Sequence, residues 1–194
     1  MDKLICHRGI HNEIIKENTY DSIYLALNSD KYIGVEFDIR ITKDKKFILW
    51  HDPTYKGKLI SNLKLKELPK YVTRLEKVLK IPTNKIFLIE IKNIGNEYNE
   101  FIKILEKSKD KNIYVMSFSV SKIKNIDIDS RTYKIGVLNY ILNTTEYFKK
   151  LDFICILNSF INSSLLEKLK NYEIISYGLV NTRKFPNISY IIDD

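Results

Sequence analysis

The run Val35-Glu36-Phe37-Asp38-Ile39-Arg40-Ile41 places two acidic side chains at alternate positions in an otherwise largely apolar stretch. β-Branched and aromatic residues dominate the run, and its length is typical of a buried strand. Successive side chains of a strand point to opposite faces, so Glu36 and Asp38 share one face. The segment therefore predicts a buried strand that carries a pair of carboxylates on one side.

Eight further apolar runs resemble this strand, and amphipathic stretches separate many of them. The runs span residues 4–6, 47–50, 86–91, 113–116, 135–138, 153–157, 174–180 and 188–192. Apolar residues at helical spacing mark the intervening segments: Tyr20, Ile23, Tyr24 and Leu27 after an N-cap at Asn18 or Thr19, then Leu75, Val78 and Leu79, then Phe101, Ile102 and Leu105, then Leu165, Leu166 and Leu169. This alternation predicts parallel βαβ units.

The number of units fits two architectures, a doubly wound sheet and an eightfold barrel. Neither Gly-x-Gly-x-x-Gly nor a P-loop follows the first strand, so the nucleotide-binding interpretation lacks its phosphate loop. With 194 residues, a barrel has about 24 residues per unit and needs minimal loops. We expect a compact TIM (β/α)8 barrel in which residues 1–194 form one domain, because no Gly-, Ser- or Pro-rich linker divides the chain.

The composition is that of a globular protein. The chain is 44% hydrophobic and 29% charged, which provides a core and excludes disordered and collagen-like classes. No apolar run reaches the roughly 18 residues of a membrane helix, and the first residues lack the apolar stretch of a signal peptide, so we expect a cytoplasmic protein. Cys6 and Cys155 lie in apolar runs, and we expect both to be buried, reduced thiols.

The net charge of +8 comes mainly from lysine. Only five of the 32 basic residues are arginine. Surfaces that bind nucleic acids usually combine arginine forks with interleaved aromatic residues. The scattered lysines favour a solvated surface, and we expect no nucleic-acid partner.

Polar residues end four consecutive predicted strands, where barrel enzymes carry their chemistry. They are His7-Arg8-Gly9, Glu36 with Asp38, His51-Asp52, and Glu90 with Lys92. Three carboxylates at one barrel mouth repel one another, and a hard divalent cation, Mg²⁺ or Ca²⁺, removes that repulsion. Two histidines offer a base and an acid near neutral pH, and Arg8 and Lys92 supply positive charge for an anionic oxygen. Together these parts indicate metal-assisted cleavage of a phosphodiester.

Each of these residues also has a structural interpretation. A single histidine at a strand end is usually hydrogen-bonded without a catalytic role, and Glu-x-Asp is usually solvated or caps a helix. Glu90 with Lys92 would form a surface pair on an edge strand. We expect His11 and Asp52 to be structural or to support neighbouring site residues. The conjunction of four such strand endings favours the functional interpretation.

Ordered motifs extend along nearly the whole chain. They are His7-Arg8-Gly9, Glu17-Asn18-Thr19, Gly34-Val35-Glu36-Phe37-Asp38, Thr42-Lys43-Asp44 and His51-Asp52, then more weakly Leu75-Glu76-Lys77-Val78-Leu79, Glu90-Ile91-Lys92, Ser117-Phe118 and Ile191-Ile192-Asp193. In this order the sequence resembles the glycerophosphodiester phosphodiesterase family. The resemblance implies a TIM barrel that hydrolyses small glycerophosphodiesters to sn-glycerol 3-phosphate and an alcohol with one divalent cation, Mg²⁺ or Ca²⁺. The roles that it implies are general acid–base catalysis for His7 and His51, metal binding for Glu36, Asp38 and Glu90, and phosphate binding for Arg8 and Lys92.

Several positions depart from the family pattern. Lys16 stands where the family usually has proline. The insertion that usually covers the substrate is nearly absent, since only some two dozen residues separate His51-Asp52 from Leu75, and we expect a shallow pocket. Residues 178–181 replace the family's Trp-Thr-Val-Asn and lack its aromatic wall, and the following helix is reduced to residues 182–187. No closing C-terminal helix follows, so we expect an under-covered barrel bottom, whose missing contacts a homodimer would supply.

Two other functions fit the same residues. A lysophospholipase D-like enzyme would use an open pocket and the positive charge at an anionic membrane surface, touching the membrane without being integral to it. A catalytically degenerate barrel that binds phosphorylated ligands would explain the lost aromatic wall, but it leaves the complete set of seven polar residues without a use.

Overall fold

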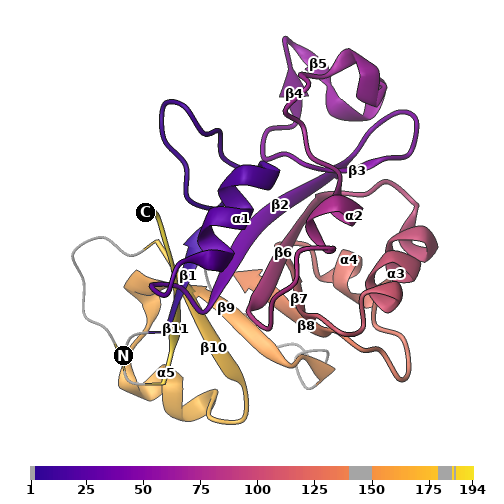
Figure 1. Cartoon of the computed structure of the whole chain (residues 1–194). Coiled ribbons are helices and arrows are strands. Elements are labelled where there is room, and N and C mark those ends of the chain that lie inside the picture. Colours follow the sequence, from indigo (N-terminus) through magenta and orange to yellow (C-terminus); the bar gives the residue numbers. More distant parts are fainter. Residues whose placement is uncertain (1–2, 140–149, 179–184, 186) are drawn as a thin grey trace.

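Eight parallel strands form a closed barrel in the computed structural model, which describes residues 3–139, 150–178, 185 and 187–194 (Figure 1). The barrel strands are β1 (Lys3–His7), β2 (Gly34–Ile41), β6 (Ile86–Asn93), β7 (Asn112–Ser117), β8 (Lys134–Asn139), β9 (Phe153–Leu157), β10 (Glu173–Tyr177) and β11 (Ser189–Ile192). The row of strands closes on itself because β1 pairs in parallel with both β2 and β11. The predicted TIM barrel is confirmed.

Short helices connect the strands. In the part of the chain that the structure describes, they are α1 (Tyr20–Asn28), α2 (Leu75–Val78), α3 (Tyr98–Lys107), α4 (Val120–Lys124) and α5 (Ser163–Lys168), with 3₁₀ helices η1 (Ile60–Asn62), η2 (Leu65–Glu67) and η4 (Asn158–Phe160). Across the described ranges, no helix has the length and apolar character needed to span a membrane.

Two apolar layers stabilise the barrel. Alternate strand residues point inward, and their cluster includes Ile5, Leu88, Met116, Leu138, Cys155 and Ile175. The opposite strand faces pack against the helices, as where Phe37 and Phe87 meet edge to face at 6.4 Å. Cys6 lies in the outer layer and Cys155 in the inner one, and both are buried and free, as expected.

The turn after β1 holds two consecutive residues in the left-handed region, Arg8 with φ 53° and Gly9 with φ 79°. Its geometry is fixed by the start of α1 and the residue before its N-cap, because the Ile10 N–H donates to the Ser22 carbonyl and the Asn18 N–H donates to the Arg8 carbonyl, both at 3.0 Å. Thr19 is the N-cap, and it exchanges hydrogen bonds with Ser22 in a capping box. The turn therefore projects the Arg8 side chain over the barrel mouth from a rigid base.

Replacing Gly9 by alanine is expected to destabilise the protein more than the same change at Gly57. Both glycines have positive φ, which costs an alanine about 1–2 kcal/mol. A Cβ at Gly9 would lie 2.5 Å from the backbone carbon of Ser22, whereas nothing lies within 4 Å of one at Gly57. Urea unfolding measures the free energy of unfolding of both variants. The loss at Gly9 should exceed the loss at Gly57 by the cost of steric overlap, about 1–3 kcal/mol. Equal losses of stability would contradict the close packing of Gly9 against Ser22.

Residues 47–49 form strand β3 (Phe47–Leu49), which corrects the expectation that they continue the barrel. β3 runs antiparallel to the carboxyl end of β2, to which the hairpin at residues 42–46 joins it. His51 therefore does not end a barrel strand. It is returned to the barrel mouth because the Trp50 N–H donates to the Asp38 carbonyl at 3.0 Å.

Residues 52–73, which we call the excursion, leave the barrel between β3 and α2. They form a hairpin of β4 (Thr54–Tyr55) and β5 (Lys58–Leu59) followed by η1 and η2, and Figure 1 shows them projecting from the rest of the barrel. A small apolar cluster of Ile48, Ile60, Leu63 and Leu68 stabilises the excursion. Apart from Arg74, the excursion comprises every residue between His51 and α2.

A polar cluster occupies the amino end of the barrel interior. Lys134 and Glu173, the first residues of β8 and β10, pair at 2.8 Å, and the Tyr114 hydroxyl donates to Glu173 at 3.0 Å. Burial raises the pKa of Tyr114, although Lys134 opposes this effect.

Asp193 and Asp194, which follow β11, are not helical. Dimerisation through the bottom of the barrel stays a prediction, which sedimentation of the protein at micromolar concentration would test.

Candidate active site

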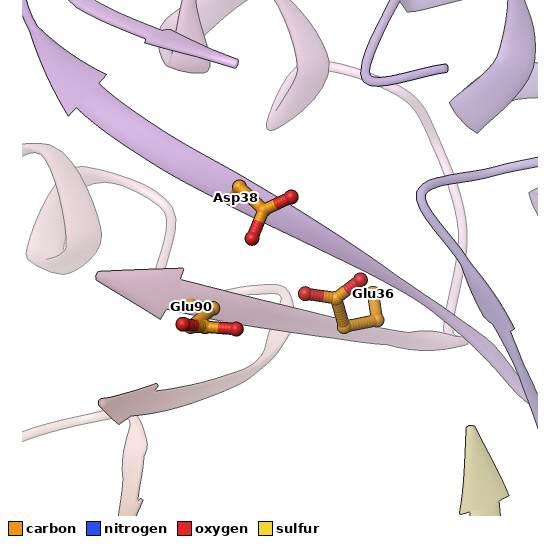
Figure 2. A group of neighbouring side chains, drawn as sticks. All are labelled: Glu36, Asp38 and Glu90. Atoms are coloured by element: carbon orange, nitrogen blue, oxygen red, sulfur yellow. The ribbon is translucent and has the colours of Figure 1, made fainter. Parts of the chain in front are cut away.

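Three carboxylates converge at the carboxyl end of the barrel (Figure 2). Glu36 and Asp38 extend from the inner face of β2, and Glu90 extends from β6, where it is in register with Asp38. One oxygen of each carboxylate lies within 4.8 Å of the other two. All three residues are buried, with at most 6% of their surface exposed. The alternation predicted from the sequence thus brings the three acids together.

Burial and mutual repulsion make the ionised cluster unfavourable. The pKa of Glu36 is raised well above its ordinary value of 4.5 by burial, then by the charges of Asp38 and Glu90. Burial and Asp38 also raise the pKa of Glu90, against the opposing effect of Lys92. A hard divalent cation would remove this repulsion, and three carboxylate oxygens at this spacing fit one. The donor set therefore suits Mg²⁺ or Ca²⁺ better than Zn²⁺.

Arg8 bridges the carboxylates to the loop above them. Its backbone N–H donates to Glu36 at 3.3 Å, its Nη1 donates to Glu17 at 2.9 Å, and its Nε lies 3.4 Å from Asp38. Burial alone would lower the pKa of Arg8, but Asp38 and Glu17 outweigh it and raise that pKa. The guanidinium is therefore a permanent positive charge beside the acids.

Lys92 lies on the same side of β6 as Glu90. Its Nζ is 2.7 Å from Glu90 and 3.3 Å from Asp38. Burial would lower the pKa of Lys92, but these two carboxylates raise it above its ordinary value. The ammonium stays charged and is held against the acidic cluster.

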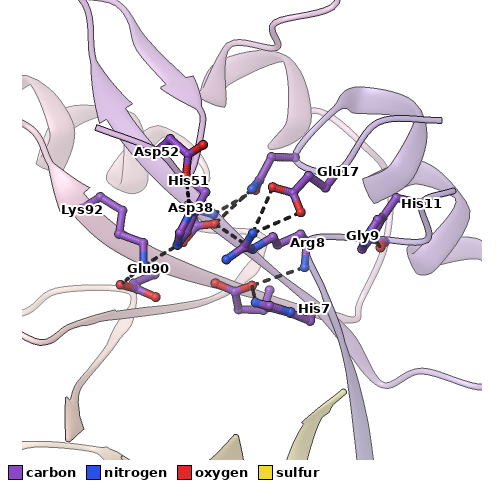
Figure 3. A network of polar contacts seen from close by, with 12 residues as sticks. His7, Arg8, Gly9, His11, Glu17, Asp38, His51, Asp52, Glu90 and Lys92 are labelled. Atoms are coloured by element: carbon purple, nitrogen blue, oxygen red, sulfur yellow. Dashed lines mark hydrogen bonds and ion pairs between the residues drawn. The ribbon is translucent and has the colours of Figure 1, made fainter. Parts of the chain in front are cut away.

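Each of the two site histidines has one ring nitrogen held by an aspartate, and Figure 3 shows this contact for His51 and Asp52. Nδ1 of His7 lies 2.7 Å from Asp193, and Nδ1 of His51 lies 2.9 Å from Asp52. A carboxylate partner favours the tautomer with hydrogen on Nδ1, which leaves the Nε2 lone pair available. Nε2 of His7 is 3.9 Å from the Glu36 carboxylate. His11 instead uses its Nδ1 to contact the Gly9 carbonyl at 2.8 Å.

The site contains polar residues that were not among those predicted from the sequence to form it. Asn18, buried with φ 55°, donates from Nδ2 to the Asp38 carboxylate and accepts from the Asp38 backbone N–H, both at 3.0 Å. Arg40 donates from Nε to the His51 carbonyl at 2.9 Å, and burial lowers its pKa although Asp38 opposes this. The alternation along β2 that placed Glu36 with Asp38 also predicts the inward position of Arg40.

Lys122 comes from α4 and no local pattern marks it. Its Nζ donates to the Lys92 carbonyl at 2.6 Å. Burial, and after it the charge of Arg40, lowers the pKa of Lys122. Lysine and arginine side chains thus approach the acidic cluster from several elements of the barrel.

The fold and this cluster define a TIM-barrel protein with a buried acidic centre, flanked by cations and by aspartate-paired histidines, at the face where barrel enzymes carry their active sites. The chain belongs to the glycerophosphoryl diester phosphodiesterase family, whose model matches residues 7–174. No match was found among curated proteins.

Solved structures show the same fold. A glycerophosphodiester phosphodiesterase from Thermotoga maritima superposes with a TM-score of 0.71 at 22% identity, covering 98% of this chain and 94% of that one. The enzyme of the same name from Parabacteroides distasonis gives a TM-score of 0.75 at 18% identity, covering 100% and 92%. An Oleispira antarctica phosphodiesterase, solved in complex with the product sn-glycerol-3-phosphate, gives 0.77 at 16%, covering 92% and 85%.

One predicted departure from the family lies almost wholly outside the described residues. Of residues 178–181, where the aromatic wall is expected to be missing, only Gly178 is described, and most of 182–187 is not.

Proposed function

We propose that this protein is a metal-dependent phosphodiester hydrolase that cleaves glycerophosphodiesters to sn-glycerol 3-phosphate and an alcohol. The observation that carries the proposal is the buried triad Glu36, Asp38 and Glu90 with Arg8 and Lys92 in direct contact with it. Membership of the glycerophosphoryl diester phosphodiesterase family supports the choice of reaction, and the product in the Oleispira antarctica structure supports the choice of substrate.

Glu36, Asp38 and Glu90 would hold the divalent cation, Mg²⁺ or Ca²⁺. When bound, such an ion supplies Lewis-acid polarisation of a phosphoryl oxygen and lowers the pKa of a coordinated hydroxyl group. Asn18 supports this role, since its two hydrogen bonds fix both the backbone and the carboxylate of Asp38. Such outer contacts orient a ligand carboxylate before a metal arrives.

Arg8 and Lys92 would hold the substrate phosphate. Both are permanently charged, and both are fixed by carboxylates, so little side-chain entropy is lost when a phosphate binds. Charge that develops on the phosphate oxygens during cleavage would be stabilised by these preorganised donors.

His7 and His51 would act as the general acid–base pair. Because Asp193 and Asp52 hold the Nδ1 atoms, each ring is oriented to exchange a proton through Nε2. The distance of 3.9 Å between His7 Nε2 and the Glu36 carboxylate supports this role for His7. One histidine would take a proton from the attacking hydroxyl and the other would give a proton to the leaving alcohol.

An assay of glycerol 3-phosphate release tests the function directly. Glycerophosphocholine and glycerophosphoethanolamine are offered to the protein with Mg²⁺, with Ca²⁺ and with EDTA, and a lysophospholipid is run in parallel. We expect release from the soluble diesters that EDTA abolishes and added metal restores. Cleavage of the lysophospholipid alone would favour the lysophospholipase D-like alternative, and binding without turnover would favour the degenerate barrel.

A further inference from the structure

The chain's positive charge is concentrated in one segment. Residues 54–80, which we call the lysine-rich segment, hold eight cationic residues and two acidic ones, and so carry a net charge of +6 out of +8. The cationic residues are Lys56, Lys58, Lys64, Lys66, Lys70, Arg74, Lys77 and Lys80. The segment comprises most of the excursion and all of α2, so this charge lies beside the barrel mouth.

Several of these lysines are exposed and lack an acidic partner. Lys58, Lys64, Lys66, Lys70 and Lys80 are all exposed, and none of them forms an ion pair with any residue in the described part of the chain. Unpaired like charges on one small surface repel one another. An anionic partner would relieve that repulsion.

Large apolar side chains are interleaved with these charges. Ile14 is 89% exposed, Leu59 49% and Tyr71 48%. Ile14 and Tyr71 line a groove of about 1030 Å³ between the loop before α1 and residues 65–80, together with Lys16, Lys66 and Lys70. An aliphatic and aromatic surface framed by lysine ammonium groups matches the boundary between headgroups and acyl chains of an anionic bilayer.

We propose that the lysine-rich segment, with Ile14, docks the protein on anionic membrane surfaces. The lysines contact the lipid phosphates, and Ile14, Leu59 and Tyr71 enter the headgroup region. Nucleic acid fits this surface less well. Seven of the eight cationic residues are lysine, so the surface offers few arginine forks to bases. Two of the three apolar side chains are aliphatic, so it offers few aromatic rings on which bases could stack. Docking is independent of the proposed hydrolase activity and would bring the barrel mouth close to lipid-derived diesters.

Vesicle co-sedimentation of the full chain tests the proposal. Vesicles of phosphatidylcholine alone are compared with vesicles in which phosphatidylglycerol replaces about a third of it, at low and at physiological ionic strength. We expect binding to the anionic vesicles only, weakened but retained at physiological salt because of the apolar side chains. Equal binding to both vesicle types, or none to either, would overturn the proposal.

Matched variants locate the surface. The triple variant K58E/K64E/K66E is expected to weaken vesicle binding by more than about tenfold, since each lysine near an anionic surface contributes roughly fivefold to partitioning. The control K107E/K109E/K168E makes the same charge change on exposed lysines of α5 and of the α3 end, and should bind nearly normally. Equal loss of binding in both variants would mean that the net charge of the protein alone causes vesicle binding, and it would contradict a specific docking surface.

A second pair isolates the apolar contribution. I14S/Y71S is expected to release the protein from anionic vesicles at physiological salt, whereas I128S, at an apolar residue 38% exposed between α4 and β8, should not. Turnover of a soluble diester by every variant should match the wild type, so failure of docking and failure of the hydrolase assignment are read separately. Retained affinity for duplex DNA at physiological salt, without vesicle binding, would assign the surface to nucleic acid and overturn the proposal.

Discussion

Replacing His51 or His7 by alanine is expected to lower kcat for glycerophosphodiester cleavage by about 10²–10⁴-fold, the usual contribution of a positioned acid or base. Each ring is held at Nδ1 by an aspartate, so deletion of the imidazole removes an oriented proton carrier rather than a mobile side chain. The measurement is steady-state release of glycerol 3-phosphate at saturating metal, and KM should change much less than kcat because binding energy comes from the cations.

His11→Ala is the matched control, because this histidine lies in the same loop as Arg8 but its Nδ1 contacts the Gly9 carbonyl and not a carboxylate. Its activity should stay within a few-fold of the wild type. Asp193→Asn and Asp52→Asn should lower kcat less than loss of the ring, since the aspartates, 77% and 70% exposed, orient the histidines and transfer no proton. Near-normal activity in both histidine-to-alanine variants would remove them from the mechanism.

Glu36→Gln is expected to have opposite effects on activity and on the stability of the metal-free protein. Loss of one of three carboxylates should reduce metal affinity at least about tenfold and activity with it. In the metal-free protein the raised pKa of Glu36 means that the folded state favours the protonated carboxyl. The stabilising contribution of this group is thus fully present below its unfolded pKa and is lost as the pH rises through the higher folded pKa.

A neutral glutamine has no such loss. The metal-free Glu36→Gln protein should therefore melt above the metal-free wild type at pH 8, by on the order of a few degrees, and the difference should shrink toward pH 4. Added Mg²⁺ or Ca²⁺ should reverse the order by stabilising the wild type alone. Thermal melts across pH with EDTA and with metal measure both effects, and Glu167→Gln on α5, whose carboxylate is 73% exposed, is the control. A glutamine variant that is less stable than the wild type at every pH would contradict the electrostatic strain in the triad.

The barrel and its carboxylate triad were predictable because they follow from local alternation. Glu36, Asp38 and Glu90 lie on strands whose inward and outward faces can be assigned from the sequence, and parallel register brings Asp38 opposite Glu90. The error at β3 had a detectable signal. Residues 42–46 are too few for a crossover to a parallel strand, which needs a dozen or more residues, so only an antiparallel return was open to the chain.

Other contacts depend on tertiary packing that no local pattern encodes. Asn18 reaches Asp38 because the Arg8–Gly9 turn and the first turn of α1 fold over β2. Lys122 reaches the Lys92 carbonyl from a helix that follows the next strand. The pairing of His7 with Asp193 joins the two ends of the described chain and arises only when β11 closes the barrel against β1.

The excursion is attached to the barrel through a narrow neck. On one side Trp50 and His51 are tied to β2, and on the other the Leu49 N–H donates to the Thr73 carbonyl at 2.9 Å while Ile48 bridges to Arg74. Because the chain is fixed on both sides of this neck, the polypeptide beyond it can lengthen or shorten without displacing His51. The residues that cover the barrel mouth can then change independently of those proposed to carry out the reaction. A longer cap grafted onto this neck should change which alcohols the protein accepts while leaving the bond-breaking step intact.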